Sequence, residues 1–192
     1  MKVYCRQQGF TLLEVLAVIA ILGVTLAAVS LTVGRGGPES QVAEKIEQFM
    51  AVSQFAADRA IITGEPMGLL LEPPQWQSDD EFEWSKLGWR YRWQMGSPNG
   101  WQDVPELKAI SFDPETKLTV MIDELRWRWE ELLDRSLPVT AYYPTGDLAD
   151  IEITITDKRL PGYEQTIHIN DYGQLEWKEL AEELEARKDA AR

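Results

Sequence analysis

The chain has 192 residues and a formal charge of −13, which suits one ordinary domain plus a short additional segment. A surface this acidic repels phosphate backbones, so we expect no nucleic-acid partner. Cys5 and His168 are the only cysteine and histidine, which excludes a disulfide framework and a His-rich zinc site. The composition therefore predicts no catalytic residues, no cofactor and no metal, and it favours a structural protein over an enzyme.

The first predicted element is an apolar helix over residues 10–33, preceded by a short basic leader over residues 1–9. At about 1.5 Å per residue the helix would span about 36 Å, enough to cross a hydrocarbon core of ~30 Å. Glu14 is its only charged residue, whereas the leader carries Lys2 and Arg6. This arrangement predicts a single membrane pass with a cytoplasmic N-terminus.

Two simpler interpretations of this segment remain open from physical chemistry alone. A secretory signal would have a shorter apolar core followed by a small-residue cleavage site. A plain membrane anchor would leave Glu14 unexplained, because a carboxylate inside a bilayer is costly unless it is paired.

The run QQGFTLLEVLAVIAILG resembles the N-terminal signal of type IV pilins and type II secretion pseudopilins, continuously from Gly9 to Gly23. The resemblance implies that a prepilin peptidase cleaves after Gly9 and methylates the new N-terminus, Phe10. Glu14 would then be the fifth mature residue, and its carboxylate could pair with the Phe10 ammonium of a neighbouring subunit in a low-dielectric bundle. Glu14 is thus expected to serve assembly.

A second helix is predicted over residues 38–62, after a glycine-rich break at Gly34–Pro38. Its apolar residues recur mostly three or four positions apart: Val42, Ile46, Phe49, Val52, Phe55 and Ile62. We expect this stripe to pack on the domain that follows.

Residues 63–177 change to short alternating segments separated by turns, which predicts a β-rich domain. The candidate strands are 67–72, 88–95, 109–112, 117–122, 139–143, 151–156, 166–169 and 175–177. With the long N-terminal helix, half transmembrane and half amphipathic, they predict an α+β fold with an antiparallel β-sandwich. Residues 124–133 are ambiguous between strand and helix, and 178–192 predict a charged tail forming a short exposed helix.

Three further features have competing interpretations. Five of the eight tryptophans fall between residues 76 and 101, which suits core and loop packing, a protein-contact surface, or carbohydrate stacking. The acidic loop at residues 79–83 suits a solvated turn or, less well, a hard-cation site. His168 is expected at a solvent-facing strand position.

The segment VTAYYPTGDLADIEITITD, residues 139–157, resembles the H-type minor pseudopilin family of type II secretion systems. ISFDPETKLTV, YRW and INDYGQLE resemble other parts of that family. The resemblance implies a long helix followed by a β-sandwich, in a subunit at the tip of the periplasmic pseudopilus that helps to export folded proteins.

The family resemblance also implies a location and partners. The chain would be anchored in the bacterial inner membrane with its globular domain in the periplasm. Its partners would be other minor and major pseudopilins, prepilin peptidase, and the inner-membrane secretion platform. The alternatives are a minor pilin of a type IV pilus, for assembly or DNA uptake, and a membrane-anchored periplasmic enzyme, which the missing catalytic motifs disfavour.

Overall fold

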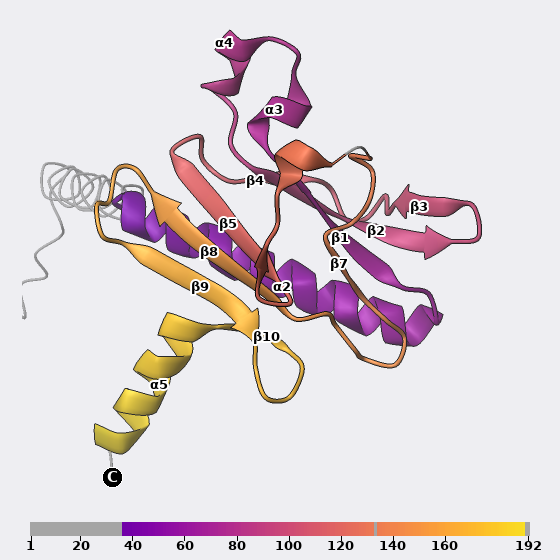
Figure 1. Ribbon diagram of the computed structural model, residues 1–192. Coiled ribbons are helices and arrows are strands. Elements are labelled where there is room, and N and C mark those ends of the chain that lie inside the picture. Colours follow the sequence, from indigo (N-terminus) through magenta and orange to yellow (C-terminus); the bar gives the residue numbers. More distant parts are fainter. Residues whose placement is uncertain (1–35, 133, 191–192) are drawn as a thin grey trace, which may run out of the picture. The chain divides into compact units, whose positions relative to one another are not determined.

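The computed structural model describes residues 36–132 and 134–190, which form a long helix, two antiparallel sheets and a C-terminal helix (Figure 1). The long helix, α2, spans Pro38–Thr63. Pro38 has its ring-fixed φ in the first turn, and Glu39 places a negative charge at the positive end of the helix. None of the helices in the described ranges is both long and apolar enough to cross a membrane, and the apolar segment predicted at 10–33 lies outside those ranges.

The described strands form two five-stranded sheets. The first sheet contains β1 (Met67–Glu72), β2 (Arg90–Ser97), β3 (Gly100–Asp103) and β7 (Thr140–Tyr142) in the order β3-β2-β1-β7, with β4 (Ile110–Ser111) also paired to β2. The second contains β5 (Thr116–Ile122), β6 (Leu125–Arg126), β8 (Ile151–Asp157), β9 (Glu164–Ile169) and β10 (Leu175–Trp177) in the order β10-β9-β8-β5-β6. All these pairings are antiparallel, and the predicted α+β fold is confirmed.

Alternation along the strands explains which face of each sheet is buried. In β8, Ile151, Ile153 and Ile155 are buried while Glu152 is exposed. In β2, Tyr91 and Trp93 face the core, as the alternation GWRYRWQM predicts. Side chains of successive strand residues point to opposite faces, so one apolar set per strand builds the interior.

The helix α2 packs on both sheets and completes their common core. It contacts β1 and β7 of the first sheet and β10 of the second. Phe49 packs edge-on against Tyr91, with ring centroids 5.0 Å apart. It also shares an interior space with Phe112 and with aliphatic residues of the second sheet such as Ile155. Burial in this core raises the pKa of the Tyr91 hydroxyl above its ordinary value.

The predicted apolar stripe of this helix is correct from Val42 to Phe49, and Val52 is half-buried against the core, but the last two predicted residues are wrong. The buried residues are Val42, Ile46, Phe49, Ser53, Ala56 and Ala60. Phe55 and Ile62, which the prediction assigned to the buried face, are 48% and 82% exposed. At about 100° per residue, these two side chains project away from the line that the buried residues follow. The small side chains of Ser53, Ala56 and Ala60 occupy the contact instead.

Several short elements differ from expectation or were not predicted. The ambiguous segment 124–133 contains the two-residue strand β6 and a 3₁₀ turn, η1 (Trp129–Glu131). The strand β3 and the short helices α3 (Pro74–Gln77) and α4 (Glu81–Trp84) were missed. The C-terminal helix α5 (Lys178–Ala190) has no buried residue among those described.

Candidate functional site

The residues predicted to carry assembly chemistry are Gly9, Phe10 and Glu14, and all three lie outside the described residues. Their roles therefore stay predictions. The described part of the chain contributes three surfaces or clusters on which a function could be built: a tryptophan cluster, an acidic groove and an exposed apolar face of α2.

The tryptophan cluster joins segments that are distant in the sequence. Trp76 lies 6.1 Å from Trp127 and 6.2 Å from Trp129 between ring centroids, and Trp89 lies 6.4 Å from each of the same two rings. Three of these four contacts are edge-to-face, the arrangement that the ring quadrupole favours. The cluster packs against the core and ties α3 and the 127–129 segment to it.

Other tryptophans in and near the Trp-rich segment also have packing partners. Trp93 stacks on Tyr142, with centroids 5.3 Å apart. Trp101 covers the backbone of Gly68, where an added Cβ would lie 2.7 Å from its ring. The indole of Trp84 donates to the Ser78 carbonyl at 2.9 Å. These contacts assign the three rings to packing.

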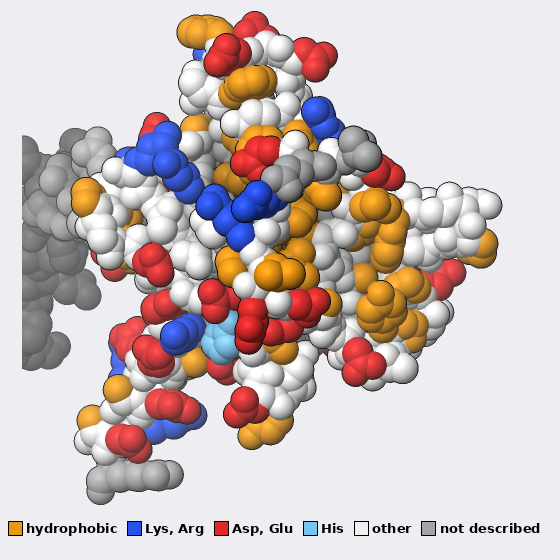
Figure 2. Space-filling view, in the orientation of Figure 1, with side chains coloured by type: hydrophobic (Ala, Val, Ile, Leu, Met, Phe, Trp, Pro, Cys, Tyr) orange, Lys and Arg blue, Asp and Glu red, His pale blue; other side chains and the backbone are white. Residues whose placement is uncertain are grey.

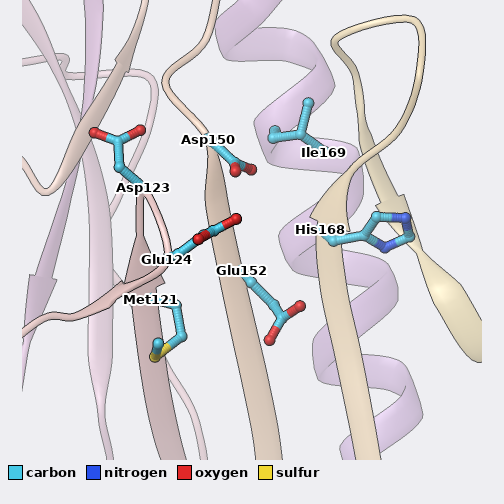
Figure 3. A pocket seen from close by; sticks show the side chains of 7 residues that line it. All are labelled: Met121, Asp123, Glu124, Asp150, Glu152, His168 and Ile169. Carbon is cyan, nitrogen blue, oxygen red and sulfur yellow. The ribbon is translucent and has the colours of Figure 1, made fainter.

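The acidic groove lies on the outer face of the second sheet (Figure 3). Its lining residues are Met121, Asp123, Glu124, Asp150, Glu152, His168 and Ile169. Asp123 and Glu124 have φ values of 49° and 64°, as a tight two-residue hairpin turn requires. That turn presents both carboxylates beside those of Asp150 and Glu152, and Figure 2 shows acidic side chains gathered over this part of the molecule.

His168 does not turn its ring into this groove. Figure 3 shows the imidazole directed away from the four carboxylates, toward β10. Its Nε2 lies 3.9 Å from Glu176 Oε2, on the neighbouring strand, and its side chain is 30% exposed. Within the described residues, no group of three or more His, Cys, Asp or Glu side chains is placed to hold a metal ion. The groove thus offers negative potential without a metal-binding geometry.

The acidic loop at residues 79–83 has a local structural use. The carboxylate of Asp80 accepts a hydrogen bond from the Phe82 N–H at 2.9 Å and caps α4. Glu83 pairs with Lys86 at 2.9 Å on the surface. Both observations fit the solvated-turn interpretation.

The third surface is apolar and lies on the C-terminal half of α2. Phe55, Ile61 and Ile62 are 48%, 57% and 82% exposed. They face away from the core that the same helix helps to form. Exposed apolar side chains that gather on one element are typical of a protein-contact surface.

Comparison with known proteins agrees with this architecture. Residues 4–30 match the prokaryotic N-terminal methylation motif, and residues 45–173 match the family described as type II transport protein GspH. A methylation motif followed by a long helix and antiparallel sheets defines a pilin-like subunit. More specifically, the chain belongs to the GspH family and is a pseudopilin of that type, a structural and non-enzymatic kind of protein.

Individual relatives match this chain over lengths that range from about half of it to nearly all of it. Type II secretion system protein H of Aeromonas hydrophila is 28% identical over 186 residues, which cover 94% of this chain and 98% of the relative. The protein of the same name from Escherichia coli K12 is 33% identical over 52% of each chain. Two structures of the minor pseudopilin EpsH from Vibrio cholerae share the fold, with TM-scores of 0.55 and 0.50 at 13% identity. They cover 73% and 70% of this chain, and 95% and 94% of EpsH.

Proposed function

We propose that this chain is a minor subunit at the tip of the periplasmic pseudopilus of a type II secretion system, where it helps to export folded proteins. The observation that carries the proposal is the presence of two signatures in one chain, an N-terminal methylation motif and a GspH domain. The first supports membrane delivery and filament assembly. The GspH domain supports the type II secretion system as the machinery in which the chain works.

Maturation begins in the inner membrane. Residues 1–9 form the leader, residues 10–33 cross the membrane once, and the domain after Pro38 lies in the periplasm. Prepilin peptidase cleaves after Gly9 and methylates Phe10. The methylation-motif match over residues 4–30 supports this step, because it contains both residues.

Glu14 supports assembly by charge pairing. An unpaired carboxylate in the apolar segment is costly, so pairing with the Phe10 ammonium of a neighbour favours the correct axial register. The partners are other minor and major pseudopilins and the inner-membrane secretion platform. The chain performs no catalysis, requires no cofactor or metal and binds no nucleic acid.

A minor pilin of a type IV pilus is the competing function. The GspH match disfavours it, since that family belongs to type II transport. The formal charge of −13 opposes its DNA-uptake form, because a DNA-binding tip needs a basic surface.

Deletion and complementation in the native host test the proposal. Deleting the gene is expected to leave exported proteins in the periplasm, and the wild-type gene is expected to restore their secretion. A Glu14→Ala variant should still insert into the membrane but should be incorporated less into complexes with other pseudopilins. Co-purification and fractionation measure both steps.

The matched control is Glu47→Ala, which removes an exposed carboxylate from α2 and should behave like the wild type. Normal incorporation of the Glu14 variant would refute the register role. Normal secretion by the deletion strain, with loss of pilus-dependent motility or DNA uptake, would favour the type IV pilus instead.

A further inference from the structure

One guanidinium group joins three segments of the fold at the start of α2. Arg159 lies just after β8 and donates from Nη1 to Gln41 Oε1 at 3.0 Å. From Nη2 it donates to Asp113 Oδ2, also at 3.0 Å. Gln41 lies in the first turn of α2, and Asp113 lies between β4 and β5. The arginine is 118 residues from the first partner and 46 from the second.

Arg159 is itself anchored by a fully buried carboxylate. The side chain of Asp157 is 0% exposed, and it accepts from Arg159 Nε at 2.9 Å and from Nη2 at 2.8 Å. The backbone N–H of Arg159 and the hydroxyl of Thr116 donate to the same carboxylate, at 2.8 and 3.3 Å. A buried carboxylate without partners would be strongly destabilising. The bidentate pairing of Asp157 with Arg159 satisfies this carboxylate and holds the guanidinium in one orientation.

The first turn of α2 has little other attachment to the core. Glu39, Ser40 and Gln41 are exposed, and Val42 is the first buried residue of the helix. The carbonyls of this turn accept the first hydrogen bonds of the helix, so fraying here opens the amides that follow. The hydrogen bond from Arg159 to Gln41 therefore supports α2 at an end where the helix frays easily.

We propose that Arg159 is a positioning residue that locks the first turn of α2 to the β-sandwich. Tension applied to the chain before Pro38 is then transmitted to the sheets and does not unwind α2. This role rests on the proposed function, in which residues 10–33 anchor the chain while the pseudopilus grows. Lysine cannot replace the arginine, because it lacks the planar fork that reaches three partners at once.

The test uses the full-length chain in detergent micelles and measures hydrogen–deuterium exchange. Gln41→Ala removes only the hydrogen bond between α2 and Arg159 and leaves the other bonds of the arginine in place. Alanine favours helix more than glutamine does, so without a lock this change would slow exchange in the first turns. With the lock, we expect exchange of the amides at residues 42–46 to be about threefold to tenfold faster.

Two more variants complete the design. Arg159→Lys should give a similar increase at residues 42–46 while the central amides of β8 stay protected. Gln48→Ala, an exposed glutamine on the same helix, is the matched control and should leave these amides unchanged or slower. Unchanged or slower exchange at residues 42–46 in both Gln41→Ala and Arg159→Lys would overturn the lock.

Secretion assays separate the lock from the proposed function. Arg159→Lys is expected to be made and inserted normally but to restore secretion less well than the wild type. Faster exchange with fully restored secretion would refute the role of Arg159 in transmitting force. If deletion and complementation with the wild-type gene do not change secretion, the proposed function is refuted. The hydrogen–deuterium exchange result for Arg159 would still hold.

Discussion

The Asp157–Arg159 pair shows how a single buried charge organises this fold. The two residues are separated by one position in the sequence, yet the arginine reaches the first turn of α2 and the β4–β5 connection. The alternation in β8 places Asp157 on the same face as the buried isoleucines, but it does not identify the partners that a buried carboxylate needs. Its importance comes from the neighbours that surround it in three dimensions.

This pair predicts an acid-dependent loss of stability. Hydrogen bonds from Arg159 hold the pKa of Asp157 below its ordinary 3.8 in the folded protein. Its contribution to the free energy of unfolding is thus complete above pH 3.8 and is lost as the pH falls through the lower folded-state pKa. Asp157→Asn should be less stable than the wild type at neutral pH and should lose part of this acid dependence. Urea unfolding followed by tryptophan fluorescence, from neutral pH to below pH 3.8, measures both.

The other ionisable groups nearby are part of that test. Asp113 also pairs with Arg159, at 3.0 Å, and Lys158 pairs with Glu115, at 3.4 Å, so both pairs contribute to the wild-type curve. Asp150→Asn, at an exposed position, controls for loss of a carboxylate in general. If the Asp157 variant and the wild type lose stability in parallel across the acid range, the pair does not contribute as described.

Among the elements, α2 shows most clearly what helical periodicity predicts and what it does not. A helix and an apolar stripe beginning at Val42 follow from spacing alone. After Phe49 the next contact could be at 52 or 53, and hydrophobicity favoured Val52. Val52 is half-buried against the core, and the small residues Ser53 and Ala56 are fully buried beside it.

We therefore expect two phenylalanines on this helix to respond differently to substitution by alanine. Phe49 is 1% exposed and Phe55 is 48% exposed. Phe49→Ala should reduce the free energy of unfolding by about 3–5 kcal/mol, because it leaves a cavity in the core. Phe55→Ala should cost less than about 1 kcal/mol. Chemical denaturation of the two variants makes the comparison, and equal losses would contradict the assignment of the buried face.

The tryptophan cluster illustrates the same limit for loops. Sequence spacing drew attention to residues 76–101, but Trp76 and Trp89 pack against Trp127 and Trp129. The partners come from a segment whose pattern was ambiguous between strand and helix. The short strand β6 and the 3₁₀ turn η1 of this segment form where the tryptophan rings pack against the core.

For the whole molecule, maturation is the most direct prediction. Wild-type protein from the membrane should lack residues 1–9 and carry one methyl group on the nitrogen of Phe10. Gly9→Leu should retain the leader, because a bulky side chain would occupy the position before the cleaved bond. Intact mass measurement distinguishes the forms. Gln7→Ala serves as the control and should still be processed, whereas mature mass from the Gly9 variant would refute the cleavage site.

Local sequence predicted a membrane anchor and most of the strands, and the resemblance of the N-terminal run added the pilin-like class. The apolar run with its single charge at Glu14 is a local pattern, and the alternation in β2 and β8 reports burial of one sheet face. Both signals come from residues close together along the chain.

Only the tertiary structure decided the second half of the buried stripe on α2, the partners of the tryptophans and the reach of Arg159. Each depends on segments that are far apart in sequence and meet only when the two sheets close around the helix. Small residues and single polar groups carry little hydrophobic signal, so packing decides whether they are buried.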